Sequence, residues 1–237
     1  AKHPAARALH FGAEDQGLHL LAASERDPDS CLDALDAAIV TRILVPEANG
    51  YRFAHALVRD AVLADLPALR SARLHRRVAD AILAVQGDAA DAAEPVAHHR
   101  YAARSFLDPL MVAQALVRAS DVARWRNALD AAERWANLAL DVLDGATRTS
   151  DAARAEVARV EVEVLEALLG MVVRRNDQAR LEALVERVRA RGESSDNDGV
   201  RALGLFLVWD DVDTVADLAD RLFLVWDDVD TVADLAD

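Results

Sequence analysis

The chain has 237 residues, of which 53% are apolar and only 5% aromatic, and its formal net charge is −14. Ala, Leu and Val supply most of the apolar residues while Gly and Pro are scarce, so the composition predicts a mostly α-helical protein of one or two domains. The negative charge argues against nonspecific nucleic-acid binding by the whole chain. The single cysteine, Cys31, excludes an internal disulfide and fits a reducing cytoplasm, and we expect neither a secretory signal nor a membrane span.

Residues 1–87 carry the only non-helical pattern that the sequence suggests. Two β-favouring triplets, 43–45 and 51–53, flank the loop 46–50 and predict a hairpin. Asp27 or Ser30 can cap the helix before it. Helices are expected on both sides: 4–11, 14–24, 31–42, 55–65 and 67–86. The predicted order is three helices, a two-stranded wing and a further helix. This is the order of a winged-helix domain.

Residues 88–237 show a succession of helical hairpins. The expected helices are 92–105, 109–123, 126–144, 150–174, 177–191, 199–209 and 212–220. Helix pairs that cannot bury their own apolar faces stack on one another, which predicts an α-solenoid similar to tetratricopeptide repeats. Trp125 and Trp135 lie ten residues apart, and we interpret them as core anchors of one hairpin.

The C-terminal segment contains a literal repeat. Residues 205–220 recur letter for letter at 222–237, and residues 205–237 hold ten Asp and one Arg. Repeats of a natural solenoid diverge, so the identity indicates a very recent duplication or an artefact of the recorded sequence, and we favour the artefact. A second copy that is present would need a packing partner for its apolar residues.

Histidines are the candidate chemical residues. His55 stands where the second strand meets a helix, and a helix start offers unpaired N–H donors and a partial positive charge to a phosphate. The alternative role for His55 is to cap that helix. His98 and His99 point about 100° apart on a helix, which disfavours a shared metal ion. His75 follows an arginine-rich helix face, which is either a solvated surface or a phosphate contact.

Four stretches carry a resemblance to a known family. They are Leu-Asp-Ala-Leu-Asp-Ala-Ala (32–38), Tyr-Arg-Phe-Ala-His-Ala-Leu-Val-Arg-Asp-Ala-Val (51–62), Ala-Arg-Leu-His-Arg-Arg-Val-Ala (72–79) and Ala-His-His-Arg-Tyr-Ala-Ala (97–103). With them the chain resembles the winged helix and tetratricopeptide-like sensor arm of bacterial STAND-class ATPase regulators of the LuxR-type or cyclase-linked kind. The likeness is specific over residues 10–105 and architectural beyond them.

The resemblance implies a longer protein with a P-loop ATPase module that binds ATP or ADP and partners this chain in cis. Relatives carry a Met-His-Asp motif whose histidine touches the β-phosphate of ADP. Ala54-His55-Ala56 is similar to it only at His55, which is therefore the one cofactor-binding residue implied, and only in the full-length protein. No glycine-rich phosphate loop occurs in the sequence, so we expect the chain itself to bind no cofactor or metal and to catalyse no reaction.

Three functions are open at this point. The first is a regulatory fragment of a STAND-type transcriptional regulator in cytoplasmic signal transduction, which mediates autoinhibition and binds a protein or small-molecule inducer on its solenoid. The second is a standalone peptide-binding scaffold, which a concave surface lined by exposed arginine and apolar residues would favour and a buried, solvent-excluded groove would not. The third is DNA binding through the winged helix, which is disfavoured because helix 30–42 offers only Arg42 against Asp33 and Asp36.

Overall fold

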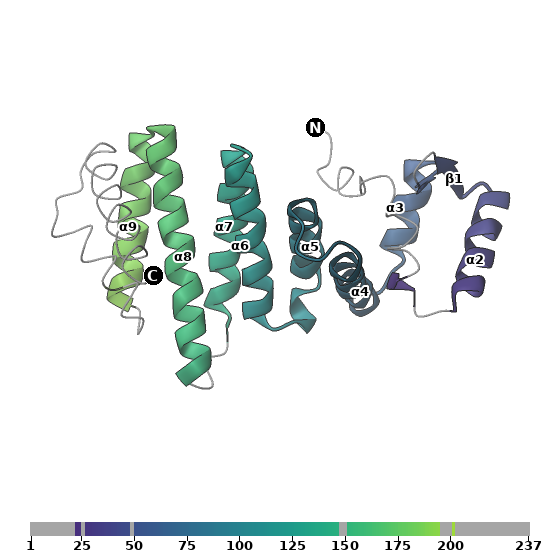
Figure 1. Cartoon of the computed structure of the whole chain (residues 1–237), viewed down its shortest axis with the longest axis horizontal. Coiled ribbons are helices and arrows are strands. Elements are labelled where there is room, and N and C mark those ends of the chain that lie inside the picture. Colours follow the sequence, from purple (N-terminus) through teal and green to yellow (C-terminus); the bar gives the residue numbers. More distant parts are fainter. Residues whose placement is uncertain (1–21, 25–26, 48–49, 147–150, 195–200, 202–237) are drawn as a thin grey trace, which may run out of the picture. The chain divides into compact units, whose positions relative to one another are not determined.

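The computed structural model describes residues 22–24, 27–47, 50–146, 151–194 and 201 (Figure 1). In this part the chain is mostly helical and contains one antiparallel two-stranded hairpin, so the predicted mostly-α class is confirmed. The chain divides into two units, residues 1–119 and 120–237, and the predicted domain boundary after residue 87 lies inside the first. The helices expected at 4–11 and 212–220 and the literal repeat lie outside the described residues, as do residues 14–21 of the helix expected at 14–24 and all of the helix expected at 199–209 except residue 201.

In the first unit, helix α2 spans Pro28–Val40. Asp27 caps its N-terminus, as the sequence indicates. The Asp27 carboxylate accepts a hydrogen bond from the backbone N–H of Ser30 at 3.0 Å. Strands β1 (Leu44–Glu47) and β2 (Gly50–Phe53) then pair from Leu44↔Phe53 to Glu47↔Gly50. Pro46, Glu47 and Gly50, which the sequence analysis assigns to the loop 46–50, are therefore paired strand residues. Helix α3 (Ala56–Ala64) follows.

Three further helices complete the first unit. Helix α4 (Ala68–Gln86) ends at Gly87, whose positive φ of 60° suits a glycine C-cap, as predicted. Helix α5 (Ala90–Ala102) packs against α4 and is followed by the short 3-10 helix η2 (Arg104–Phe106) and by α6 (Pro109–Trp125). The buried residues here are mostly Ala and Val, whose small side chains let helix axes approach closely.

The described part of the second unit is built from the end of α6 and three further helices. They are α7 (Leu129–Asp144), α8 (Asp151–Arg175) and α9 (Gln178–Ser194), with α7 packed on α8 and α8 on α9 (Figure 1). The largest fully buried side chains include Leu140, Leu165, Leu169 and Leu181. The core is thus contributed by the buried apolar side chains of these helices.

The turns between α6 and α7 and between α8 and α9 have the same construction. Asn127 and Asn176 adopt φ values of 58° and 52°. The N–H of the next residue donates to a carbonyl of the preceding helix, from Ala128 to Ala123 in the first turn and from Asp177 to Val172 in the second. This is a Schellman motif with Asn in the left-handed position, the residue that tolerates that conformation best after Gly. The same motif follows α2, where Arg42 has a φ of 56° and the Ile43 N–H donates to the Ala38 carbonyl, so it marks the ends of helices.

Trp125 contradicts the interpretation of the two tryptophans as core anchors. Its side chain is 89% exposed, while Trp135 is half-buried on α7. Trp125 is the last residue of α6, whereas Trp135 lies on α7, so a turn separates the two residues. Helical spacing places two residues on a common face only when both belong to one helix.

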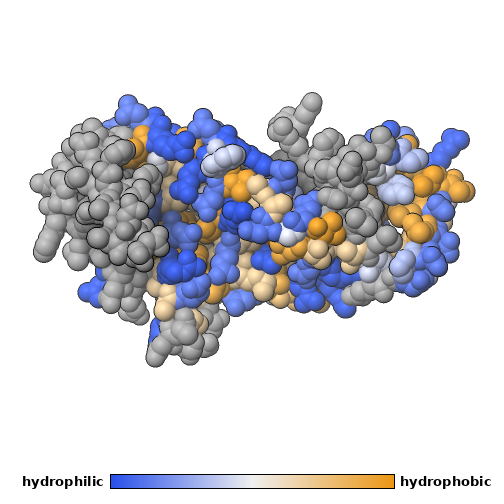
Figure 2. Space-filling model, in the orientation of Figure 1, coloured by the Kyte–Doolittle hydropathy of each residue, from blue (hydrophilic) through white to orange (hydrophobic). Residues whose placement is uncertain are grey.

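Elements α2 and α3 bury none of their side chains. Val40 and Leu57 are each 82% exposed, and Ile43 and Leu63 are exposed as well. Apolar surface is visible around α2 and the hairpin in Figure 2. In the described residues no helix is both long and apolar enough to cross a membrane.

Candidate functional site

The described part of the second unit contains a cleft between α7, α8 and α9. Its volume is about 170 Å³. The apolar side chains Leu168, Met171, Val172 and Leu184 form a buried floor, because each is at most 9% exposed. The polar residues that line it are Glu133, Asn137, Arg175, Arg180 and Arg187.

Helical periodicity explains how these residues come together. On α8 the lining positions are 168, 171, 172 and 175, and on α9 they are 180, 183, 184 and 187, so both follow i, i+3, i+4, i+7. Glu133 and Asn137 are one turn apart on α7. Each helix therefore presents a single face, and in α8 and α9 the apolar residues of that face lie beside its arginines.

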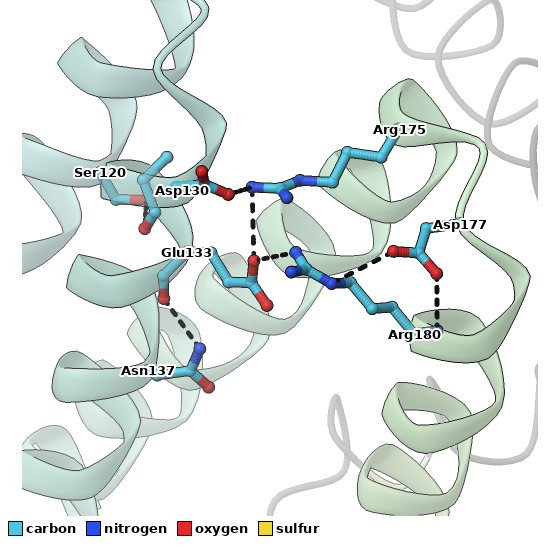
Figure 3. A network of polar contacts seen from close by, with 8 residues as sticks. Ser120, Asp130, Glu133, Asn137, Arg175, Asp177 and Arg180 are labelled. Atoms are coloured by element: carbon cyan, nitrogen blue, oxygen red, sulfur yellow. Dashed lines mark hydrogen bonds and ion pairs between the residues drawn. The ribbon is translucent and has the colours of Figure 1, made fainter.

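An ion-pair network links α7 to α8 and α9 (Figure 3). Arg175 pairs with Asp130 at 2.6 Å and with Glu133 at 3.4 Å, and Arg180 reaches the same Glu133 carboxylate at 2.5 Å. The hydrogen bond from Arg175, together with its charge, holds the pKa of Asp130 below its usual range. Arg175 is mostly buried and its Nε atom has no hydrogen-bond partner among the described residues. Glu133 is thus the carboxylate that two cleft arginines share.

Arg187 differs from the other two arginines of the cleft. Its guanidinium donates to the side-chain oxygen of Asn137, and the Asn137 amide donates to the Glu133 carbonyl at 2.8 Å. No carboxylate of the described residues forms an ion pair with Arg187. A neutral amide therefore positions this cation, which leaves its charge available to a carboxylate that enters from outside.

The far end of α9 is held by a separate, buried contact. Arg191 donates from Nε to Glu161 at 3.0 Å and also pairs with Asp144, so α7, α8 and α9 are joined through one side chain. Glu161 is only 4% exposed. These contacts fix the three helices that form the cleft and are themselves outside its lining.

His55 lies in the first unit, at the position that the sequence indicates. It is the N-cap residue of α3 and its carbonyl accepts hydrogen bonds from the N–H groups of Val58 and Arg59. Its side chain is exposed and makes no capping hydrogen bond, so the alternative role as a side-chain cap is not seen. The implied role towards a phosphate stays a prediction.

The sequence analysis interprets His75 as a surface residue or a phosphate contact, and His98 and His99 as helix residues that share no metal ion. The structure brings all three side chains together. His75 on α4 is half-buried, and its Nδ1 lies 2.7 Å from the Nδ1 of His99 on α5. No group of three His, Cys, Asp or Glu residues in the described ranges has the arrangement of a metal site. The surface-helix prediction for His75 is wrong because α5 packs over it.

Sequence reasoning missed the cleft altogether. The usable signal was the shared i, i+3, i+4, i+7 pattern of apolar residues and arginines on α8 and α9. Comparisons with known protein families, with curated proteins and with solved structures find no match to this chain. The site must therefore be interpreted from its own geometry.

Proposed function

We propose that this chain is a non-catalytic interaction module of a cytoplasmic signalling regulator, and that the α7–α9 cleft binds an acidic segment of a protein partner. The observation that carries the proposal is an apolar floor beside arginines, one of which has no described carboxylate partner. The exposed Arg180 side chain matches what the sequence analysis expects of a peptide-binding scaffold, whereas the buried apolar floor does not. The arrangement is compatible with a tetratricopeptide-like sensor arm.

The dimensions of the cleft favour one apolar side chain as the anchor of the bound segment. A cavity of about 150 Å³ lined by apolar residues holds a benzene molecule, so about 170 Å³ accepts one aromatic or branched side chain. Burying such a side chain contributes about 1.5–3 kcal/mol. Specificity must therefore come from the polar residues around the anchor.

The charges of the cleft select carboxylates next to that anchor. Arg175, Arg180 and Arg187 outnumber the single lining carboxylate, Glu133. Guanidinium groups bind carboxylates with charge-assisted, often bidentate hydrogen bonds, each contributing about 1.5–3 kcal/mol when shielded from water. A segment with one large apolar residue flanked by Asp or Glu fits both features.

A peptide titration tests the proposal. Labelled 12-residue peptides with one Leu or Phe between acidic residues are titrated with the full chain and compared with peptides in which Asn and Gln replace the acidic residues. We expect binding of the acidic set only, and about a tenfold loss of affinity in Arg187→Gln. Arg174→Gln is the matched control, since Arg174 is an exposed arginine of α8 outside the cleft. Equal binding of both peptide sets, or an equal effect of both variants, would refute the proposal.

A regulatory role in a STAND-type ATPase is the wider context that we propose for this module. Helix, hairpin and helix follow one another in the order of a winged helix, and Val40 and Leu57 stay exposed on elements that bury nothing. An ATPase module in cis is a fitting cover for those side chains, with His55 near its nucleotide. The purified chain should then neither hydrolyse ATP nor bind ADP tightly, and a measurable rate of hydrolysis by this chain would contradict that role.

A further inference from the structure

Three of the seven histidines of the chain form one cluster in the first unit. The ring centroids of His75 and His99 are 5.0 Å apart, those of His98 and His99 5.3 Å, and those of His75 and His98 6.1 Å. The Nδ1 atoms of His75 and His99, 2.7 Å apart, form a hydrogen bond in which one nitrogen donates and the other accepts. This bond exists only while at least one of the two rings is neutral.

The cluster lies in the seam between α4 and α5. His75 continues the buried stripe of Ala72, Ala79 and Ile82 on α4, at spacings of three and four residues. His99, only 7% exposed, continues the corresponding stripe of α5 between Val96 and Ala103. The His75–His99 hydrogen bond therefore joins the two helices through their packed faces.

Nothing within the cluster stabilises a positive charge. The Nε2 atom of His99 is buried and has no hydrogen-bond partner among the described residues. No described carboxylate forms an ion pair with the three rings. Burial, followed by the charges of His75 and His98, lowers the pKa of His99 to about 3, and burial also lowers the pKa of His75 and of His98.

The charged groups around the cluster do not compensate for this. The charged residues of α4, α5 and the adjacent η2 are Arg70, Arg73, Arg76, Arg77, Asp80, Asp91, Glu94, Arg100 and Arg104. Six of these nine residues are basic. Of the three carboxylates, Asp91 is exposed near the start of α5, and Asp80 acts on Arg100, whose pKa is lowered by burial and raised by Asp80. Glu94 lies one turn before His98 but is exposed, so water screens its charge.

We propose that the His75–His98–His99 cluster is an acid-sensitive latch, which holds α4 against α5 near neutral pH and releases the pair when it takes up protons from solvent below about pH 6. Opening exposes the rings to water, where a histidine binds a proton with a pKa of about 6.5. The folded pKa values are lower than this. The stability of the closed pair is therefore complete above about pH 6.5 and is lost progressively as the pH falls towards the folded values.

Hydrogen exchange measured by mass spectrometry on the full chain tests the latch, since it reports opening segment by segment. If opening takes up one proton, the population of the open pair rises about eightfold between pH 7 and pH 5.5, and more if several rings take part. After correction for the intrinsic exchange rate, protection of α4 and α5 should fall by at least that factor. Protection of α8 and α9, in the other unit, serves as the internal reference.

Variants separate the latch from general acid sensitivity. His75→Gln and His99→Gln remove titrating rings from the seam, so each should flatten the pH dependence of α4–α5 protection. His55→Gln is the matched control, because His55 is an exposed histidine of the same unit outside the cluster. A fall in wild-type α4–α5 protection no larger than that of α8–α9 overturns the proposal without any variant. An undiminished fall in His75→Gln overturns it as well.

Discussion

Glu133 is the residue at which ligand recognition and internal ion pairing compete. Its carboxylate accepts Arg180 at 2.5 Å and lies 3.4 Å from Arg175, so it neutralises two of the arginines that we assign to the ligand. Replacing it by Gln keeps the size and shape of the side chain and removes the charge. We expect Glu133→Gln to bind acidic peptides more tightly than the wild-type chain.

The exposure of the partners sets the expected magnitudes. The side chains of Glu133 and Arg180 are 33% and 42% exposed, and pairs of this kind contribute about 0.2–1 kcal/mol to stability. Arg175 keeps Asp130 at 2.6 Å after the change. The variant should thus lose about 1 kcal/mol of unfolding free energy. Removing a negative charge about 4 Å from an incoming carboxylate in water favours binding by about 1 kcal/mol, or about fivefold.

Two measurements on the same variant check both numbers. Urea unfolding, followed by tryptophan fluorescence, reports stability through Trp135, which lies two residues after Glu133 on α7. Titration with an acidic peptide at low and high salt reports affinity, and the gain should shrink as salt screens the arginines. Glu163→Gln is the control, since Glu163 is an exposed carboxylate of α8 that pairs with Arg159 outside the cleft.

One result would refute the reasoning directly. If Glu133→Gln weakened the binding of acidic peptides while Glu163→Gln left it unchanged, Glu133 would be a ligand contact and the cleft would not select carboxylates. A loss of more than about 3 kcal/mol of stability would show instead that the shared ion pair behaves as a buried one.

Two further substitutions test the packing that shapes the second unit. Ser120 is 3% exposed and donates to the Ala132 carbonyl at 2.9 Å, so Ser120→Ala should cost about 1 kcal/mol in urea unfolding, whereas the exposed Ser105→Ala should cost nothing measurable. Arg191→Ala deprives the buried Glu161 carboxylate of its arginine and should cost about 3 kcal/mol. The double variant Arg191→Ala, Glu161→Ala should lose less than the sum of its two single variants, and an additive loss would contradict a coupled pair.

Local signals in the sequence predict the helices and their ends well. The expected helix 67–86 appears as α4, and Gly87 ends it with a positive φ because a residue without Cβ tolerates that conformation. Asp27 caps α2 because its carboxylate reaches backbone N–H groups only two and three residues away. The hairpin is also present, with tighter pairing than predicted. Each of these features depends on interactions within a few residues.

Partners that are distant in the sequence were beyond such reasoning. From the sequence, His98 could be compared only with its neighbour His99. The contact that unites the cluster joins His75 to His99, which are 24 residues apart. In the cleft, Arg180 meets Glu133 across 47 residues and Arg187 meets Asn137 across 50. Trp125 shows the converse. Its spacing from Trp135 suggested a core residue, but its side chain, at the end of α6, is 89% exposed.

The sequence by itself determined that the chain is mostly helical, where most helices begin and end, and that His55 stands at the start of α3. Propensity, capping and apolar periodicity act over one or two helical turns, so they are legible without a structure. Only the tertiary structure decided which helix faces meet. Those meetings place three imidazoles in the α4–α5 seam and gather arginines over the apolar floor of the α7–α9 cleft, because side-chain packing between helices selects contacts that no local pattern encodes.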